Sequence, residues 1–105
     1  MFDLLKKIFG IEKTDYAQLV ADGAIILDVR TAGEFNNGHI KGSINIPVDK
    51  LAANLHKLKA KNKTVITCCA SGARSAAAKG ILKSNGYASV HNGGAWQSLN
   101  RKLNN

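Results

Sequence analysis

Short continuous runs of aliphatic and β-branched residues recur along the chain, separated by stretches in which apolar residues return every three or four positions. The first pattern is typical of strands buried on both faces, and the second of helices that bury one face. The runs predict strands at 24–28, 44–46, 65–68 and 87–90, and an edge strand starting at Ile11. Strands that alternate with helices predict an α/β fold with a mainly parallel central sheet of about five strands flanked by helices.

Helices are predicted between these strands. Thr14 is expected to cap the first, with Asp15 in its first turn and an end near Ala21, and Thr31 to cap a second that runs through Phe35. A third helix is expected to open at Val48 or Asp49, with Leu51, Leu55 and Leu58 on one face. A fourth is expected to follow Arg74 and to end at about Ser84, and a fifth to run from Ala95 to about Leu103.

Residues 1–10 are expected to form a short amphipathic helix ahead of one domain at 11–105. Phe2, Leu5 and Phe9 share its apolar face, and Gly10 ends it. We expect this helix to pack on the domain, with contact to a membrane surface or a partner as the alternative. The sequence shows no signal peptide and no membrane span, so a cytoplasmic location is expected.

Residues 64–75 hold the stretch that looks most like chemistry. A β-branched run leads into Cys68 and Cys69, breaks at small residues around Gly72, and continues after Arg74 as an alanine-rich helix. In a strand–turn–helix of this kind, backbone N–H groups and the helix dipole converge on the turn and favour negative charge. An ordinary cysteine is only about 3% ionised at pH 7, so this setting should enrich the reactive thiolate.

Three motifs carry a family resemblance. Cys69-Ala-Ser-Gly72-Ala-Arg74-Ser75 resembles the Cys-x-x-Gly-x-Arg-Ser loop of rhodanese-domain sulfurtransferases. The segment at 26–47, with Asp-x-Arg, Gly-His-Ile and a Gly-x-Ile-Asn-Ile-Pro ending, resembles that family's upstream motif. The segment at 91–96 resembles its Gly-Gly…Trp close. The motifs occur in family order over roughly residues 11–101, and the fold they imply is a three-layer, rhodanese-like one.

The resemblance implies a mechanism at Cys69. Its thiolate would take a sulfane sulfur from a donor such as thiosulfate, hold it as a persulfide, and give it to a thiophilic acceptor, either cyanide or a cellular thiol. A protein donor or acceptor is also compatible with it. No cofactor is implied. The residues expected to bind the anionic donor are those of the loop: Ala70, Ser71, Gly72, Ala73, Arg74 and Ser75.

Ala70 departs from the family pattern, because many members that use thiosulfate carry a basic residue at that position. Its side chain adds no charge, so backbone amides must provide most of the anion binding. A persulfide or protein donor becomes a natural alternative to thiosulfate. Ser71 offers a hydroxyl to the substrate, and Ser75 is expected to cap the helix.

Two other functions remain open. Counted from Cys68, the spacing to Arg74 is Cys-x5-Arg, which is the phosphate loop of cysteine phosphatases and arsenate reductases. The position of Gly72 fits the shorter loop counted from Cys69, so we expect Cys68 to be the last strand residue, pointing away from the site. A role as resolving cysteine is the alternative. The third function is a non-catalytic module that only binds a partner.

Several residues outside the loop are expected to build its surroundings rather than to react. Asp28 and Arg30 look like an ion pair near the site, and Arg74 is expected either to reach the anion or to tie the loop to a carboxylate such as Asp28 or Glu34. His39 is expected to be a hydrogen-bonded scaffold residue. Trp96 is expected to form a wall of the site.

Composition narrows the remaining function classes. The net charge of +8 comes from 15 basic against 7 acidic residues, but the only lysine cluster, at 57–63, carries no interleaved aromatics, so nucleic-acid binding is not favoured. The positive field suits a small anionic substrate. No Cys/His spacing predicts a metal site. Two adjacent cysteines indicate a reducing compartment or a reactive thiol rather than a disulfide framework.

Overall fold

The sheet at the centre of the molecule has four parallel strands in the order β2-β1-β3-β4. A computed structural model describes residues 14–59 and 61–104. The strands are β1 (Ile25–Asp28), β2 (Ile44–Asn45), β3 (Val65–Cys69) and β4 (Val90–Ala95). The predicted α/β fold with a parallel sheet flanked by helices is confirmed. The predicted helix at 2–9 and the edge strand at Ile11 lie outside the described residues.

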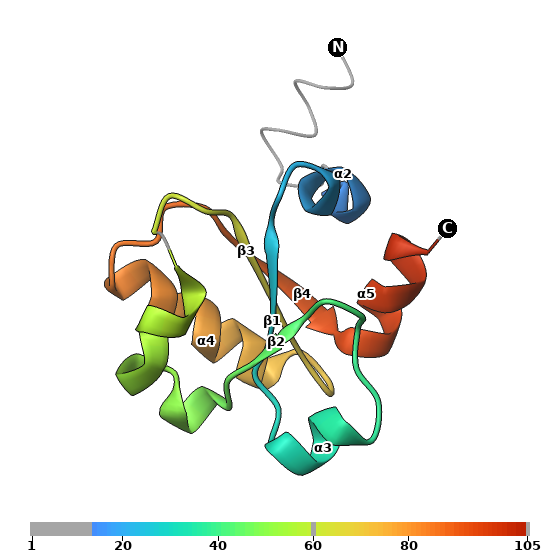
Figure 1. Ribbon diagram of the computed structural model, residues 1–105, viewed down its shortest axis with the longest axis horizontal. Helices are drawn as coiled ribbons and strands as arrows, with labels where there is room; N and C mark the ends of the chain where they lie inside the picture. Colours follow the sequence, from blue (N-terminus) through green and yellow to red (C-terminus); the bar gives the residue numbers. More distant parts are fainter. Residues whose placement is uncertain (1–13, 60, 105) are drawn as a thin grey trace.

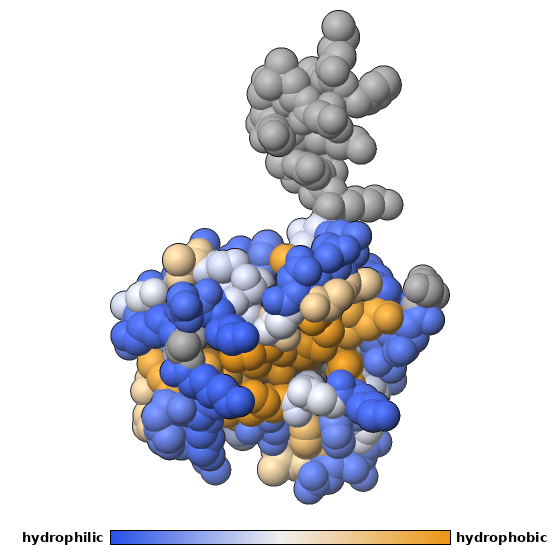
Figure 2. Space-filling model, turned by 45° about the horizontal axis from the view of Figure 1, so that its top comes forward, coloured by the Kyte–Doolittle hydropathy of each residue, from blue (hydrophilic) through white to orange (hydrophobic). Residues whose placement is uncertain are grey.

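Helices cover both faces of this sheet and make the three layers visible in Figure 1. One apolar core joins the sheet to α4 (Ala73–Ser84) and to two 3₁₀ segments, η1 (Val48–Lys50) and η2 (Ala52–Leu58). The other core joins the sheet to α2 (Tyr16–Ala21) and α5 (Trp96–Leu103). In Figure 2 an apolar band crosses the visible face of the molecule with hydrophilic residues on either side of it.

Strand alternation distributes side chains between the two cores. Leu27 and Val65 point to the core that contains α4, whereas Ile26 and Ile66 point to the core that contains α5. The same alternation sends Cys69 to the α4 side and Cys68 to the α5 side. Two cysteines that are adjacent in sequence therefore lie in different environments.

Several helix boundaries differ from their predictions. Asp15, not Thr14, caps α2, because its carboxylate accepts the N–H of Gln18. Thr31 caps α3 (Ala32–Asn36) as predicted, in a capping box with Glu34.

The helix predicted after Pro47 is wrong in kind, because the chain forms the two 3₁₀ segments instead. The Asn54 side chain donates to the carbonyl of Lys50, while its N–H bonds to Leu51 O, one residue closer than an α-helix requires. Leu51 and Leu58 are nevertheless buried on one side, as the pattern predicted.

The last strand begins later than predicted. Tyr87 is buried in the core and its N–H bonds back to Leu82 O, so it ends the α4 turn rather than starting a strand. The Gly93–Gly94 pair, which in a sequence is a typical turn signal, lies inside β4, where the pairing with β3 shifts register between Thr67 and Cys69. This irregularity places Asn92 beside the cysteine loop.

Candidate active site

Cys69 is the last residue of β3, and donor groups of the following loop surround its Sγ. The amide of Gly72 donates to Sγ at 2.9 Å and that of Ser75 at 3.4 Å. The Ser75 hydroxyl lies 3.5 Å from the same atom. Although Cys69 is fully buried, Ala70, next to it, is exposed. Sγ is thus buried under the loop, between the loop's hydrogen-bond donors and the apolar core that contains α4.

The loop takes this shape because of Gly72. Its φ of 109° lies in the left-handed region that favours glycine, and Gly72 is also the N-cap residue of α4. The chain leaves the buried strand, reverses at this glycine and enters the helix, so successive N–H groups point inward at the sulfur. The predicted cap at Ser75 is wrong, since Ser75 lies inside α4, where its Oγ is 2.9 Å from Gly72 O.

The net effect of this environment is to lower the pKa of the Cys69 thiol. Burial raises the pKa, but hydrogen bonds from the Ser75 hydroxyl and from the amides of Ser75, Gly72 and Ser71 to the thiolate outweigh the burial. Stabilisation of a sulfur anion is therefore the chemistry that this loop supports.

Cys68 has the opposite character. It is fully buried in the apolar core with Ile26, Ile66 and Leu99. Burial raises its pKa to about 12, and the nearby Asp28 carboxylate adds to that effect. A thiol that stays protonated and faces away from the loop cannot attack a phosphate or an arsenate. The geometry therefore speaks against the Cys-x5-Arg hypothesis.

Arg74 ties the loop to α3 instead of extending freely into solvent. Its guanidinium donates to both carboxylate oxygens of Glu34, at 2.7 and 3.0 Å. This hydrogen bond, together with the one from the Thr31 amide, lowers the pKa of Glu34 to about 2. Of the two roles considered for Arg74, the structure shows the carboxylate partner.

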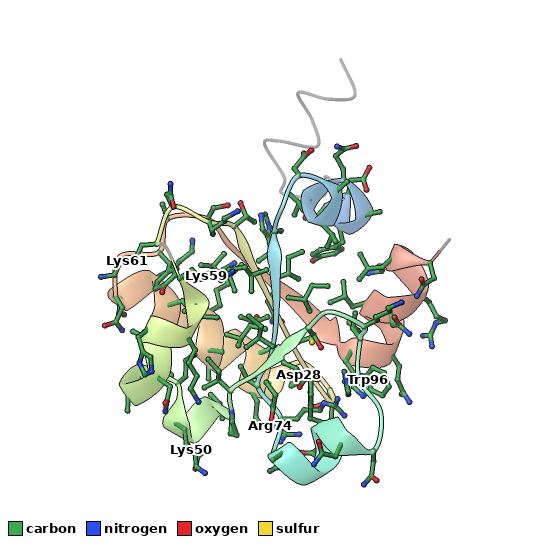
Figure 3. The ribbon with its side chains drawn as sticks, in the orientation of Figure 1. Asp28, Lys50, Lys59, Lys61, Arg74 and Trp96 are labelled. Atoms are coloured by element: carbon green, nitrogen blue, oxygen red, sulfur yellow. The ribbon has the colours of Figure 1, made fainter. Side chains whose placement is uncertain are left out.

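Asp28 and Arg30 form a buried ion pair below the loop. Their closest atoms, Arg30 Nη2 and Asp28 Oδ2, are 2.7 Å apart, and the side chains are 5% and 0% exposed. Arg30 also donates to Gly38 O at 2.7 Å, and its guanidinium carbon lies 4.7 Å from the centre of the Trp96 ring. Figure 3 shows Asp28, Arg74 and Trp96 on the α3 side of the molecule. The pair joins three parts of the chain into one frame: β1, the loop that follows α3, and α5.

His39 belongs to this frame and not to the reacting group. Its Nδ1 lies 2.7 Å from Phe35 O, and its ring stacks on the Phe35 ring with centroids 3.7 Å apart. Within residues 14–59 and 61–104, no cluster of three His, Cys, Asp or Glu side chains is arranged to hold a metal.

The rim of the loop carries little charge. Ala70, Ser71 and Ala73 are exposed, and the one cation of the loop, Arg74, is paired with Glu34. Lys59 and Lys61 lie on a different side of the molecule from Arg74 in Figure 3. An anion bound at this loop would therefore depend on main-chain amides.

Asn92 is the site residue that sequence reasoning missed. Its carboxamide contacts Ser75, Gly72 and Gly94. The available signal was the sequence Asn92-Gly93-Gly94, because asparagine followed by glycines favours an Asx turn. The pattern alone does not indicate which distant loop the side chain meets.

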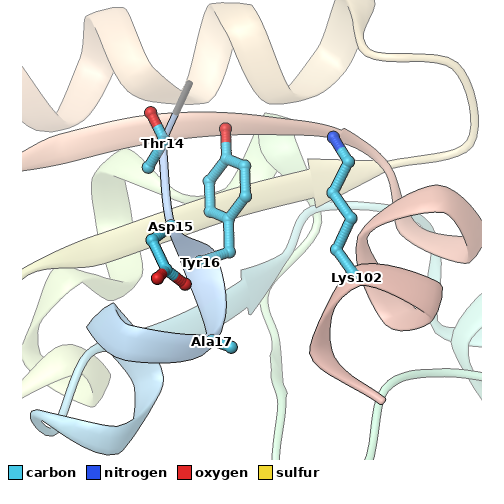
Figure 4. A pocket seen from close by; sticks show the side chains of 5 residues that line it. All are labelled: Thr14, Asp15, Tyr16, Ala17 and Lys102. Atoms are coloured by element: carbon cyan, nitrogen blue, oxygen red, sulfur yellow. The ribbon is translucent and has the colours of Figure 1, made fainter. Parts of the chain in front are cut away.

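One surface pocket among the described residues is separate from the cysteine loop. A pocket of about 630 Å³ is lined by Thr14, Asp15, Tyr16, Ala17 and Lys102 (Figure 4). The Lys102 ammonium lies 5.5 Å from the centre of the Tyr16 ring. None of these residues belongs to the donor set around Sγ. Among the described helices, none is long and apolar enough to cross a membrane.

Comparison with known proteins identifies the family. The rhodanese-like domain model matches residues 12–98. The thiosulfate sulfurtransferase PspE of Escherichia coli is 34% identical over 74 residues, which cover 70% of this chain and 71% of PspE. A sulfurtransferase of Allochromatium vinosum is 32% identical over 84 residues, 78% of each chain. A solved rhodanese with anions from E. coli has a TM-score of 0.68 and 32% identity over 72% of this chain and 91% of its own. The chain belongs to the rhodanese-like domain family.

Proposed function

We propose that this protein is a sulfurtransferase that carries a sulfane sulfur as a persulfide on Cys69. The observation that carries the proposal is the set of amide and hydroxyl donors of Gly72 and Ser75 around Sγ. Relatives at 32–34% identity that are named as sulfurtransferases support the same class of activity. The intact donor set also argues against a module that only binds a partner.

In the first step, the Cys69 thiolate attacks the outer sulfur of a donor such as thiosulfate. A bond forms between Sγ and that sulfur, the S–S bond of thiosulfate breaks, and sulfite leaves with the electron pair. The negative charge then resides on the terminal sulfur of the persulfide. Loop amides that stabilise the thiolate are placed to stabilise this anion, which is covalent catalysis through an activated nucleophile.

In the second step, a thiophilic acceptor attacks the terminal sulfur. With cyanide a C–S bond forms, the Sγ–S bond breaks, and Cys69 returns as a thiolate while thiocyanate leaves. A thiol acceptor leaves as a persulfide in the same way after losing its proton to solvent. A reducing compartment such as the cytoplasm, the expected location, would keep Cys69 reduced between turnovers.

The uncharged rim bears on the choice of donor. Ala70 adds no cation, and Arg74 is already paired with Glu34, so thiosulfate would be bound by amides alone. We therefore expect a high KM for thiosulfate, and a persulfide on a small thiol or on a protein is a donor that needs less charge at the rim.

The experiment is a sulfur-transfer assay from thiosulfate to cyanide with matched cysteine variants. Cys69→Ser should lose all turnover, whereas Cys68→Ser should keep activity within about threefold, because Cys68 does not contact the loop. If Cys68→Ser abolished turnover in a folded protein and Cys69→Ser did not, the assignment of the nucleophile would be wrong.

A further inference from the structure

Asn92 makes three hydrogen bonds that bring its carboxamide into the cysteine loop. Its Oδ1 accepts from the Ser75 hydroxyl at 2.6 Å and from the Gly94 amide at 3.0 Å. Its Nδ2 donates to Gly72 O at 3.4 Å. Ser75 and Gly72 both donate to Cys69 Sγ, so Asn92 contacts the sulfur's partners without contacting the sulfur.

The orientation of this carboxamide follows from its neighbours. The Gly94 N–H is a donor, so the atom that faces it must be the oxygen Oδ1. Gly72 O is an acceptor, so the atom that faces it must be Nδ2. Both contacts require the same orientation. Since Oδ1 has no proton, the hydrogen bond of 2.6 Å between it and Ser75 uses the proton of the Ser75 hydroxyl.

That hydroxyl has one proton and several acceptors. Asn92 Oδ1 is 2.6 Å from Ser75 Oγ, Gly72 O is 2.9 Å away and Cys69 Sγ is 3.5 Å away. While the proton is on the Asn92 side, the lone pairs of Oγ face Sγ. This arrangement accepts the S–H of a thiol, but it opposes a thiolate, which needs the hydroxyl proton for itself.

We propose that Asn92 is a positioning residue that holds the Ser75 hydroxyl proton whenever Cys69 Sγ is uncharged and releases it when the thiolate forms. The consequence for catalysis rests on the proposed function. Sγ is uncharged in the thiol, and it is also uncharged in the persulfide, because the negative charge of the persulfide lies on the outer sulfur. Rotation of one hydroxyl switches between the two arrangements. Asn92 thus stabilises the loaded enzyme relative to the free thiolate.

Among the residues that the structure describes, no charged side chain takes over the role that the Ser75 hydroxyl has toward Cys69 Sγ. Within the described part of the chain, no ionisable side chain forms an ion pair or hydrogen bond with Sγ. Arg74 is paired with Glu34, and Cys68 stays protonated. Other ionisable side chains near β4 include His91 on that strand, Tyr16 on α2, Lys102 on α5, Lys79 and Lys83 on α4, and Arg30, which stacks on Trp96 just after the strand.

The test is a pH titration of the Cys69 thiolate, followed by its ultraviolet absorbance. Asn92→Ala frees the Ser75 proton for Sγ and should lower the pKa of Cys69 by about half to one unit, roughly three- to tenfold in the ionisation equilibrium. Asn92→Asp keeps the acceptor, strengthens it and should raise the pKa. In a Ser75→Ala background, Asn92→Ala should leave the pKa unchanged, because the shared proton is gone.

Tyr16→Phe is the matched control. It removes a hydrogen bond of 3.2 Å to the backbone oxygen of Asn92 while leaving the carboxamide in place. The pKa of Cys69 should not change in this variant. A purely structural role for Asn92 would instead shift the pKa upward in both Asn92 variants, since a displaced loop takes its amides away from Sγ.

The proposal is overturned if Asn92→Ala leaves the pKa unchanged or raises it, or if it lowers the pKa equally without Ser75. If Asn92→Ala does not fold, Asn92→Asp provides the test. It must raise the pKa of Cys69 more in the protein that contains Ser75 than in the Ser75→Ala background. The titration requires no sulfur transfer. Failure to load sulfur from thiosulfate would therefore count against the proposed function, while the titration would still judge Asn92.

Discussion

At the scale of single residues, one step along β3 separates a cysteine whose thiolate is stabilised by hydrogen bonds from one that faces an apolar core. Both cysteines are fully buried, so burial alone does not distinguish them. Cys69 faces amide and hydroxyl donors that lower its pKa against the effect of burial, and Cys68 faces aliphatic side chains. The difference arises from hydrogen bonds that a turn directs to one side of the strand.

Gly72→Ala tests the role of that turn. Alanine at a φ of 109° is strained by about 1–2 kcal/mol, and relief of the strain would move the Gly72 amide away from Sγ. The pKa of Cys69 should rise and sulfur transfer at neutral pH should fall at least about tenfold. Thiolate titration and turnover measure the two effects.

Gly42→Ala is the control for Gly72→Ala. Gly42 has a φ of 85° and lies between α3 and β2, where an added Cβ would meet nothing within 4 Å. It should lose similar stability and keep the pKa of Cys69. An equal pKa change in both variants would show that strain, not the amide, is responsible.

At the scale of elements, the sequence predicted the strands and helices that have local signals and missed the features that depend on contacts between distant segments. The buried runs around Ile26 and Ile66 marked β1 and β3, and Thr31 marked the start of α3, because these signals are local. In η2 the Asn54 side chain takes the Lys50 carbonyl that the backbone of an α-helix would use, a competition that the apolar pattern does not reveal.

The course of β4 likewise depends on packing across the fold. Gly93–Gly94 reads as a turn from the sequence, yet the pair lies in a strand because it must pass close to β3 and α5. Similarly, the motif residues of the cysteine loop could be listed from the sequence, but the partner of Arg74 and the role of Asn92 required knowledge of which segments meet.

Gly93→Ala should disturb the sheet where β3 and β4 meet. An added Cβ would lie 2.9 Å from Ile66 Cγ2 and from Thr67 O, so the variant should lose about 1–3 kcal/mol of unfolding free energy. Chemical denaturation measures the loss. Gly80→Ala is the control: its Cβ would meet nothing within 4 Å in the interior of α4, and it should gain about 0.5–1 kcal/mol. Equal stability of the two variants would contradict this packing.

The Glu34–Arg74 pair connects α3 to α4 and gives a pH dependence. The pKa of Glu34 falls from 4.5 to about 2 on folding, so its contribution to stability is present above about pH 4.5 and is lost as the pH falls toward 2. Glu34→Gln should lack this part of the acid transition, as seen in the difference between the two pH–stability curves. Parallel curves over that range would contradict it.

At the scale of the whole molecule, positive charge is in excess while the loop itself is nearly neutral. The net charge is +8, but the rim residues Ala70, Ser71 and Ala73 are uncharged. We propose that the field of the molecule attracts anions to the protein in general and that the loop amides select among them at the last step. In this account the net charge of the protein sets how fast an anion reaches it, and the loop amides set how tightly the anion binds.

Ionic strength tests that division. Alkylation of Cys69 by anionic iodoacetate should slow several-fold between low salt and about 0.15 M, where screening extends over about 8 Å. Alkylation by neutral iodoacetamide should not change, which makes it the control, and neither reaction needs sulfur transfer. Equal salt dependence of the two rates would contradict a role of the field.

The most direct test of the central claim is the intact mass of the protein after incubation with thiosulfate and removal of excess donor. The mass should rise by one sulfur atom, peptide mapping should place that sulfur on Cys69, and cyanide should remove it with release of thiocyanate. A protein that gains no sulfur from thiosulfate or from a small-molecule persulfide, or that gains it on Cys68, would contradict the account.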